Sequence, residues 1–133
     1  MAADPAPREA RATIAIRWRD LDPLGHVNQA VYHELLEENR GALFASLEEN
    51  AFPFVLARME LAYRNEVRRD HETVEVVCRV AKVGTPSVTT AHQIVVPDGT
   101  VAAEGSSVLV AWDPKARSSR DLPHAERAAL GGS

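Results

Sequence analysis

The chain has a single cysteine, no long apolar run and no excess of positive charge. Cys78 is the only cysteine among 133 residues, so no disulfide forms within the chain. Its place in an apolar run predicts a buried, unreactive thiol. No apolar stretch approaches the roughly 20 residues of a membrane-spanning helix, and the first residues lack the apolar core of a secretory signal. Together with the unpaired cysteine, these absences predict a cytoplasmic protein without a membrane span. The net charge of −4 argues against general nucleic-acid binding.

Residue spacings typical of metal and nucleotide sites are also missing. The sequence has no HxxxH or CxxC pair, no P-loop and no glycine signature of a dinucleotide-binding fold. We therefore expect no metal site. There is no internal repeat that would indicate a repeat architecture.

The chain does contain enough apolar material for one core. Hydrophobic residues make up 45% of it, and a domain of this length buries roughly 70% of the surface of its unfolded chain. We expect a flexible leader over residues 1–11 and a short helix with a loose tail over residues 124–133.

Apolar spacing predicts one strand, one long helix and four further strands. Alternation over residues 12–19 puts Ile14, Ile16 and Trp18 on one face of a half-buried strand. Asn28 is a good N-cap, and the apolar spacing after it predicts a helix over residues 29–49. Further strands are predicted over residues 55–67, 73–83, 87–96 and 100–112, with a break at residues 50–53 and a short helix over residues 122–130.

Short turns separate the last four strands, which favours an antiparallel sheet. Pro97-Asp98-Gly99 is one such turn signal. One amphipathic helix can cover one face of this sheet, which gives an α+β layer pair. The sheet would keep open edges and one bare face, so we expect copies of the chain to associate.

The turn before the long helix is the best place for chemistry. Pro23 blocks strand pairing and Gly25 permits a positive φ, so the first strand cannot continue through it. Asp22 in this turn would lie near the helix N-terminus, whose N–H groups carry partial positive charge. Such groups can stabilise an oxygen that becomes negative during a reaction.

One motif runs through this part of the chain: Asp20-x-Asp22-x-x-Gly25-His26-Val27-Asn28-x-x-x-Tyr32, followed by Glu37-x-x-Arg40. It resembles the hotdog-fold acyl-CoA thioesterases, in particular the 4-hydroxybenzoyl-CoA thioesterase-like branch with its bacterial long-chain acyl-CoA thioesterases. The similarity covers about residues 12–123, the expected thioesterase domain, and implies an antiparallel β-sheet wrapped around one long central α-helix. It also implies a homodimer or homotetramer that hydrolyses acyl-CoA to free acid and CoA, without a cofactor because CoA is part of the substrate.

The resemblance makes Asp22 the catalytic carboxylate, either as a nucleophile or as a general base on water. Attack at a thioester carbonyl also needs a group that stabilises the oxyanion, and N–H groups near Gln29 can do so. Gln29 departs from the family pattern, because many members have a second asparagine there.

Other motif residues are carried as substrate-binding candidates, beginning with Gly25. Asn28 either caps the helix or contacts the bound thioester or water. His26 is expected to be a structural histidine bonded to the backbone, although hotdog hydratases pair a histidine with a carboxylate. Tyr32 and Glu37 either line the pocket or have plainer roles, in the core and in an ion pair on the helix surface.

Further charged residues have two possible roles as well. Asp20 is expected to be a solvated turn carboxylate, with an effect on Asp22 as the alternative. The phosphates of CoA need a basic patch, against the plainer alternative of solvated charge, and the candidates are Arg58, Arg64, Arg68, Arg69, Arg117 and Arg120.

Two other functions fit the same motif. One is a non-catalytic module that binds acyl thioesters or acyl carriers, and the other is a hotdog enoyl-CoA hydratase that uses His26. Thiol release from acyl-CoA distinguishes hydrolysis from both.

Overall fold

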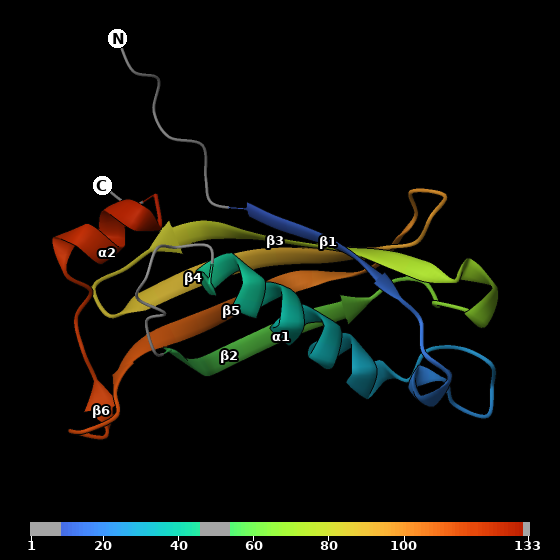
Figure 1. The fold of residues 1–133 in the computed structure, drawn as a ribbon, viewed down its shortest axis with the longest axis horizontal. Helices are drawn as coiled ribbons and strands as arrows, with labels where there is room; N and C mark the ends of the chain where they lie inside the picture. Colours follow the sequence, from blue (N-terminus) through green and yellow to red (C-terminus); the bar gives the residue numbers. More distant parts are fainter. Residues whose placement is uncertain (1–8, 46–53, 132–133) are drawn as a thin grey trace, which may run out of the picture.

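The strands of this protein curl over a single long helix (Figure 1). The structure is a computed structural model that describes residues 9–45 and 54–131. In chain order the elements are β1 (Glu9–Ala15), η1 (Trp18–Asp20), α1 (Gln29–Ala45), β2 (Phe54–Tyr63), η2 (Arg69–His71), β3 (Thr73–Val83), β4 (Ser87–Val95), β5 (Val101–Asp113), β6 (Ser118–Ser119) and α2 (His124–Ala129). Five antiparallel strands follow the order β1-β3-β4-β5-β2, and β6 pairs with β5.

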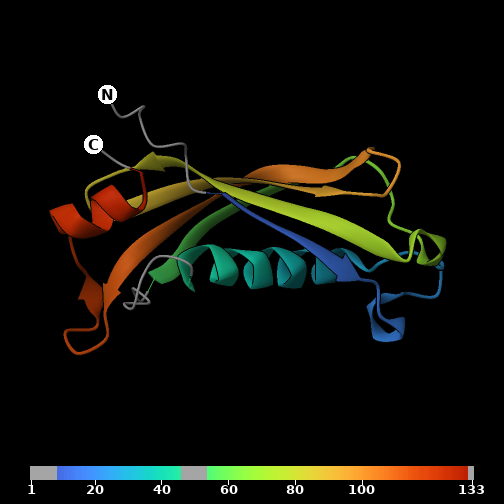
Figure 2. The ribbon, with the colours of Figure 1, turned by 45° about the horizontal axis from the view of Figure 1, so that its top comes forward.

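Helix α1 lies along one face of the sheet, and the strands curve over it (Figure 2). Leu36 on α1, Val76 on β3 and Ile94 on β4 are fully buried in the core between these layers. Burial of each such side chain contributes about 1.5–3 kcal/mol to stability. The hotdog architecture implied by the resemblance is confirmed.

The core continues toward the C-terminal end of α1. Cys78 on β3 is fully buried there in a second cluster with Leu43 and Leu130. This burial raises the pKa of the Cys78 thiol, as predicted for an unreactive cysteine.

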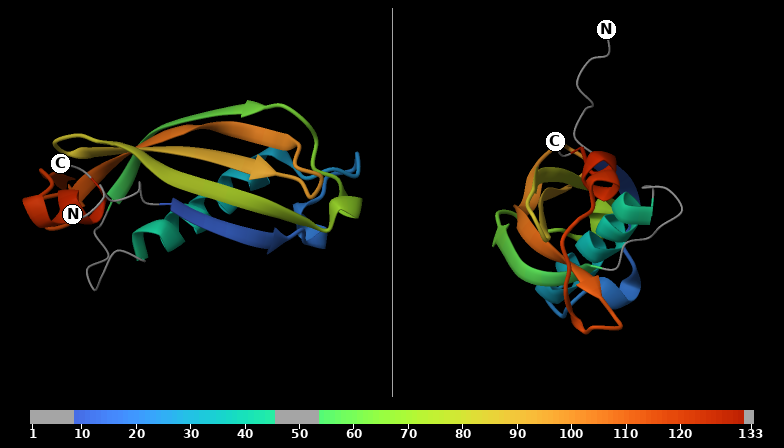
Figure 3. Two further views of the ribbon diagram at one scale, coloured as in Figure 1. Left: turned by 90° about the horizontal axis from the view of Figure 1, so that it is seen from above. Right: turned by 90° about the vertical axis from the view of Figure 1, so that its left-hand side faces the viewer.

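Strands β1 and β2 form the two edges of the sheet (Figure 3). The pairing of β2 with β5 shifts register between Leu56 and Arg58, which displaces the side-chain alternation by one position. Val55 and Leu56 are exposed, and only Met59 and Leu61 of the predicted inner face pack against the core. The β2 edge thus presents apolar side chains to solvent.

The first predicted strand lies earlier in the chain than expected. Strand β1 begins at Glu9, inside the expected leader, and ends at Ala15. Trp18 starts the 3-10 helix η1 and is 76% exposed, which corrects its placement on the buried face. The Asp20 N–H donates to the Arg17 carbonyl at 2.9 Å, which closes the turn that follows the strand.

Helix α1 begins at Gln29, as predicted, and is described to Ala45. The predicted continuation to residue 49 and the break at residues 50–53 lie outside the described residues. Helix α2 occupies the centre of the helix predicted over residues 122–130. Among the described residues, no helix has both the length and the apolar character needed to cross a membrane.

Candidate functional site

A tight turn between Leu21 and Val27 connects η1 to α1. These two residues form an isolated antiparallel bridge. Within this turn, the Asp22 N–H donates to the His26 carbonyl at 3.0 Å, and the Gly25 N–H donates to the Asp22 carbonyl at 3.0 Å. Gly25 has a φ of +82°, which residues with a side chain rarely adopt. The Asp-x-x-Gly-His spacing therefore closes a small hairpin.

The side chains of Asp22 and His26 meet across this hairpin. Nδ1 of His26 lies 3.0 Å from Oδ2 of Asp22, and the Leu24 N–H donates to Oδ1 at 2.9 Å. Both side chains are partly shielded from solvent, with 16% of Asp22 and 27% of His26 exposed. The His26 ring thus bonds a carboxylate, whereas we expected it to bond the backbone.

The N-terminus of α1 begins directly after this hairpin. The Asn28 Oδ1 accepts from the Ala30 N–H at 2.9 Å, which makes Asn28 the helix cap, the first of its two predicted roles. The Asn28 carbonyl accepts from the Val31 N–H, also at 2.9 Å. Within the described residues the Gln29 N–H has no acceptor, as is usual for the first residue of a helix, and is available to an anionic oxygen.

A cavity of about 240 Å³ opens beside the start of α1. It brings together the motif residues His26, Gln29 and Tyr32 with the C-terminal end of β2 and the residues after it. Tyr32 is buried, which raises its pKa, and its ring centroid lies 5.3 Å from that of Tyr63. The lining residues are His26, Val27, Gln29, Tyr32, Tyr63, Arg64, Asn65 and Glu66.

Of the lining residues from Tyr63 to Glu66, only Arg64 was a candidate from the sequence, as one of the phosphate-binding arginines. These lining residues fall in the part of the chain that resembles the thioesterases, and they end a predicted strand. Only the tertiary packing of β2 against α1 places them at the site. Their signal in the sequence was the end of an apolar strand next to several polar residues.

Three predicted site residues do not line this cavity. Gly25 shapes the hairpin, and Asn28 caps the helix. Glu37 is exposed on α1, about 12 Å along the axis from Gln29 by the rise per residue of a helix. Asp22 is also absent from the cavity wall and reaches it through His26.

Asp20 is buried, which corrects the expectation of a solvated carboxylate. Only 2% of it is exposed, and its Oδ2 accepts from the Arg17 N–H at 2.8 Å and from the Arg17 Nε at 3.1 Å. The Asp20 carbonyl accepts from the Asn28 N–H at 2.8 Å. Asp20 therefore ties η1 to the start of α1.

Most of the candidate phosphate-binding arginines lie in ion pairs. Arg64 is the one that lines the cavity, and it lies 3.5 Å from Glu104. Arg69 instead stacks over the ring of Trp18, 5.0 Å from its centroid, and Arg117 lies in a turn with a φ of 55°. The remaining ion pairs are Arg58–Glu60, Arg68–Asp70 and Arg120–Glu126.

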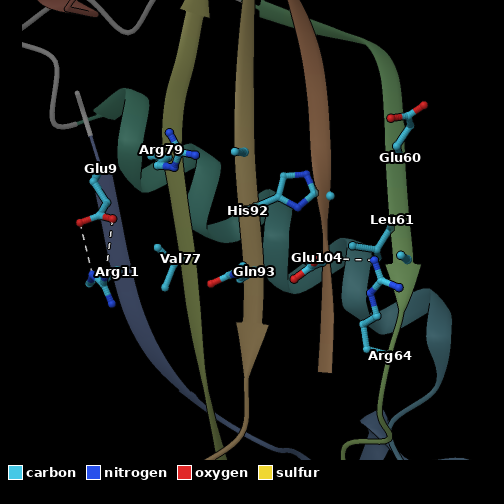
Figure 4. A pocket seen from close by; sticks show the side chains of 13 residues that line it. Glu9, Arg11, Glu60, Leu61, Arg64, Val77, Arg79, His92, Gln93 and Glu104 are labelled. Atoms are coloured by element: carbon cyan, nitrogen blue, oxygen red, sulfur yellow. Dashed lines mark hydrogen bonds and ion pairs between the residues drawn. The ribbon is translucent and has the colours of Figure 1, made fainter. Parts of the chain in front are cut away.

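A larger hollow of about 690 Å³ lies on the face of the sheet away from α1 (Figure 4). Charged side chains of both signs line it, and several pair with one another, as Arg11 does with Glu9 at 3.2 Å. None of the motif residues lies there. We therefore place the candidate site at the cavity beside α1.

Buried polar groups under α1 lie outside this site. His92 on β4 is 3% exposed, and burial together with the nearby Arg40 guanidinium lowers its pKa to about 4. Neither ring nitrogen of His92 has a hydrogen-bond partner among the described residues.

Comparisons with known proteins identify the family of this chain. A model of the thioesterase-like superfamily matches residues 16–130. A thioesterase from Thermus thermophilus, solved with coenzyme A and zinc, is 33% identical over 91% of this chain and 90% of its own, with a TM-score of 0.82. Among curated proteins, none is similar enough in sequence to match.

Two further solved structures resemble the chain closely. A candidate acyl-CoA thioesterase from Xanthomonas campestris is 31% identical over 82% of this chain and 96% of its own, with a TM-score of 0.71. A candidate thioesterase from Pseudomonas aeruginosa is 28% identical over 94% of this chain and 99% of its own, with a TM-score of 0.77. With a family match over most of its length and a hotdog fold, this chain belongs to the thioesterase-like superfamily.

Proposed function

We propose that this protein hydrolyses acyl-CoA thioesters to a free carboxylic acid and CoA at the cavity beside the start of α1. The observation that carries this proposal is the Asp22–His26 pair, held next to a helix N-terminus with a free N–H group. Membership of the thioesterase-like superfamily supports the reaction type. The coenzyme A bound to the Thermus relative supports CoA as the thiol part of the substrate.

The chemistry follows from where charge develops. When an oxygen nucleophile attacks a thioester, the carbonyl oxygen becomes negative, and the Gln29 N–H at the positive end of α1 can stabilise it. In other hydrolases, removal of one such donor lowers kcat by a factor of about 10²–10³. The negatively charged carboxylate of Asp22 either activates a water molecule for the attack or attacks the carbonyl carbon itself.

The cavity wall suggests how the substrate lies. Val27, Tyr32 and Tyr63 provide an apolar and aromatic surface for the acyl group. Arg64 at the rim is the cation available to an anionic part of CoA, once its exposed ion pair with Glu104 opens. Gly25 and Asn28 support the site indirectly, Gly25 by shaping the hairpin and Asn28 by capping the helix. A role for Glu37 in substrate binding remains a prediction.

The exposed edge of β2 supports a homodimer as the functional unit. Its backbone has no partner strand on one side among the described residues, and Val55 and Leu56 are exposed there. A second copy paired along this edge would cover these side chains. Its backbone would also run past Tyr63, at the mouth of the cavity, so each site would lie beside the subunit interface.

The cytoplasmic location of the protein remains a prediction from the sequence.

Thiol release from a panel of aliphatic and aromatic acyl-CoAs tests the proposal. Wild-type protein should release CoA and free acid in equal amounts from at least one member of the panel. The Asp22–His26 pair also suits a hydratase, so the panel should include an enoyl-CoA whose hydration is followed separately. Hydration without thiol release would favour that alternative, and binding with neither reaction would favour a carrier-binding module.

A further inference from the structure

We infer that His26 takes the proton from the attacking water, and that Asp22 is a positioning residue that holds and stabilises the His26 ring. This inference rests on the proposed function and deepens it. It assigns the proton-transfer step to a different residue from the one that the motif suggests.

The bonds of Asp22 are the first argument. Its Oδ1 accepts from the Leu24 N–H at 2.9 Å, and its Oδ2 lies 3.0 Å from Nδ1 of His26. The side chain is 16% exposed, and Asp22 does not line the cavity. A carboxylate engaged at both oxygens and set behind another side chain is better placed to orient that side chain than to reach a substrate.

The state of His26 is the second argument. An ionised carboxylate oxygen only accepts hydrogen bonds, so the 3.0 Å contact places a proton on Nδ1 of His26. In the neutral ring, the lone pair is then on Nε2. His26 lines the cavity beside Gln29, so Nε2 is the remaining polar atom of a ring already at the site. Imidazole is the side chain most often used for proton transfer near neutral pH.

The backbone around His26 is the third argument, because it holds the ring in place. His26 forms a bridge with Arg68, and the Val27 N–H donates to the Val67 carbonyl at 2.7 Å. The His26 carbonyl accepts from the Asp22 N–H on the other side of the hairpin. His26 is thus anchored on both sides, as a proton-transfer group must be.

The step balances without any further reactant. Nε2 of His26 takes one proton from water while the water oxygen bonds to the thioester carbonyl carbon, and the Gln29 N–H stabilises the resulting oxyanion. When the carbon–sulfur bond breaks, the Nε2 proton passes to the departing CoA thiolate. The products are a carboxylic acid and CoA, and His26 is neutral again. Asp22 stays ionised throughout and stabilises the imidazolium.

Other charged groups face the same cavity and would affect its pH profile. Arg64 and Glu66 line it, and Arg68 lies 3.7 Å from Glu66. The test therefore compares variants at the same pH and does not depend on a single titration curve.

Two substitutions of His26 separate proton transfer from positioning. His26→Asn keeps an N–H donor near the place of Nδ1, so it can still bond Asp22, but it has no Nε2. His26→Ala removes both atoms. If His26 is the base, both variants should lose about 10²–10⁴ in kcat, and added imidazole should restore part of the activity of His26→Ala. His26→Asn with kcat within about tenfold of wild type would overturn the inference, because only the bond to Asp22 would then matter.

The double variant Asp22→Asn/His26→Ala tests whether the two residues act as one unit. It should be no slower than His26→Ala alone, since Asp22 has nothing left to orient. If the two substitutions lowered kcat by factors that multiply in the double variant, Asp22 would act on the substrate by itself, which would contradict the inference. His124→Gln, on the exposed face of α2, is the matched control and should keep wild-type activity. Thermal melting confirms that each variant is folded.

A measurement without substrate distinguishes this inference from the proposed function. ¹⁵N NMR of wild-type protein should show His26 as the Nδ1–H tautomer, and Asp22→Asn should reduce that preference. A wild-type His26 with its proton on Nε2 would overturn the assignment even if the enzyme is active. Wild-type protein that has the Nδ1–H tautomer but releases no thiol would contradict the proposed function, and the base role would fall with it.

Discussion

Arg17 and Asp20 are joined by three hydrogen bonds. The Asp20 Oδ2 accepts from the Arg17 backbone N–H at 2.8 Å and from the Arg17 Nε at 3.1 Å, and the Asp20 N–H donates to the Arg17 carbonyl at 2.9 Å. Asp20 is almost fully buried, and its carbonyl also accepts from the Asn28 N–H. This arrangement closes the turn after β1 and fixes where α1 begins. The position of the Asp22–His26 hairpin, which lies between these two points, therefore depends on Asp20.

Removing the Asp20 carboxylate should destabilise the protein, although Asp20 itself does not line the cavity. Asp20→Ala loses two hydrogen bonds that involve a charged group, and we expect the free energy of unfolding to fall by about 2 kcal/mol. Urea denaturation measures this change. Asp98→Ala is the control, because Asp98 accepts from the Thr100 N–H in an exposed turn and should cost under about 1 kcal/mol. Equal losses in the two variants would contradict the structural role of Asp20.

Two glycine substitutions should have opposite effects on stability. A Cβ on Gly105 would collide with the backbone oxygen of Glu60 on β2, so Gly105→Ala should cost about 3 kcal/mol or more. Apart from its chain neighbours and the backbone of α1 itself, no atom of the described residues lies within 4 Å of a Cβ added to Gly41, so Gly41→Ala should raise the free energy of unfolding by about 0.5–1 kcal/mol. Thermal melting of the two variants gives the comparison, and a rise in Tm for Gly105→Ala would contradict the pairing of β2 with β5.

His92 should make stability depend on pH in mildly acidic solution. Burial and the Arg40 charge lower its pKa to about 4, whereas an imidazole in the unfolded chain titrates near about 6.5. The unfolded chain binds the extra proton between these values, so stability is fully present above about pH 6.5 and falls as the pH drops toward 4. Protonation of His92 alone should lower the free energy of unfolding by up to about 3 kcal/mol.

Urea denaturation of wild-type protein and His92→Gln at about pH 7 and about pH 4.5 measures this dependence. The variant should lose less stability than wild type over this interval, whatever its stability at neutral pH. His124→Gln, at an exposed position, should match wild type. An equal pH dependence in wild type and His92→Gln would show that His92 is not the group responsible.

Charge on the β2 edge should separate the proposed dimer. Lysine in place of Leu56, which is 48% exposed, would place a cation where a second β2 strand is expected to pack. Light scattering should give twice the chain mass of 14.5 kDa for wild type and the single mass for Leu56→Lys. Ala128→Lys, on the exposed face of α2, should keep the wild-type mass. A monomeric wild type would contradict the proposed dimer.

Periodicity in the sequence predicted the layers of this fold because the buried faces are regular. The alternation around Val76 and Cys78 and the cap at Asn28 have direct local causes, and the structure confirms them. The exposure of Trp18 and Val55 was not predictable in the same way. A buried carboxylate at Asp20 ends the first strand early, and a bulge after Leu56 displaces the pattern in β2. Both features depend on contacts that a residue pattern does not contain.

The candidate site was only partly predictable for a similar reason. The motif identified Asp22, His26, Gln29 and Tyr32, which lie within one short stretch of chain. It did not predict the contact between Asp22 and His26, because that contact depends on the left-handed conformation of Gly25. Tyr63 joins the site from β2, through packing between elements that are distant in sequence.

The most direct test of the account is the rate of thiol release by wild-type protein and Asp22→Asn, with the best acyl-CoA of the panel. Asp22→Asn is nearly isosteric but lacks the carboxylate charge that faces His26 and that we propose is needed for the reaction. We predict a fall in kcat of at least about 10², with an unchanged melting temperature, and no fall for the exposed control Asp121→Asn. Equal rates for wild type and Asp22→Asn would contradict a catalytic site at this hairpin.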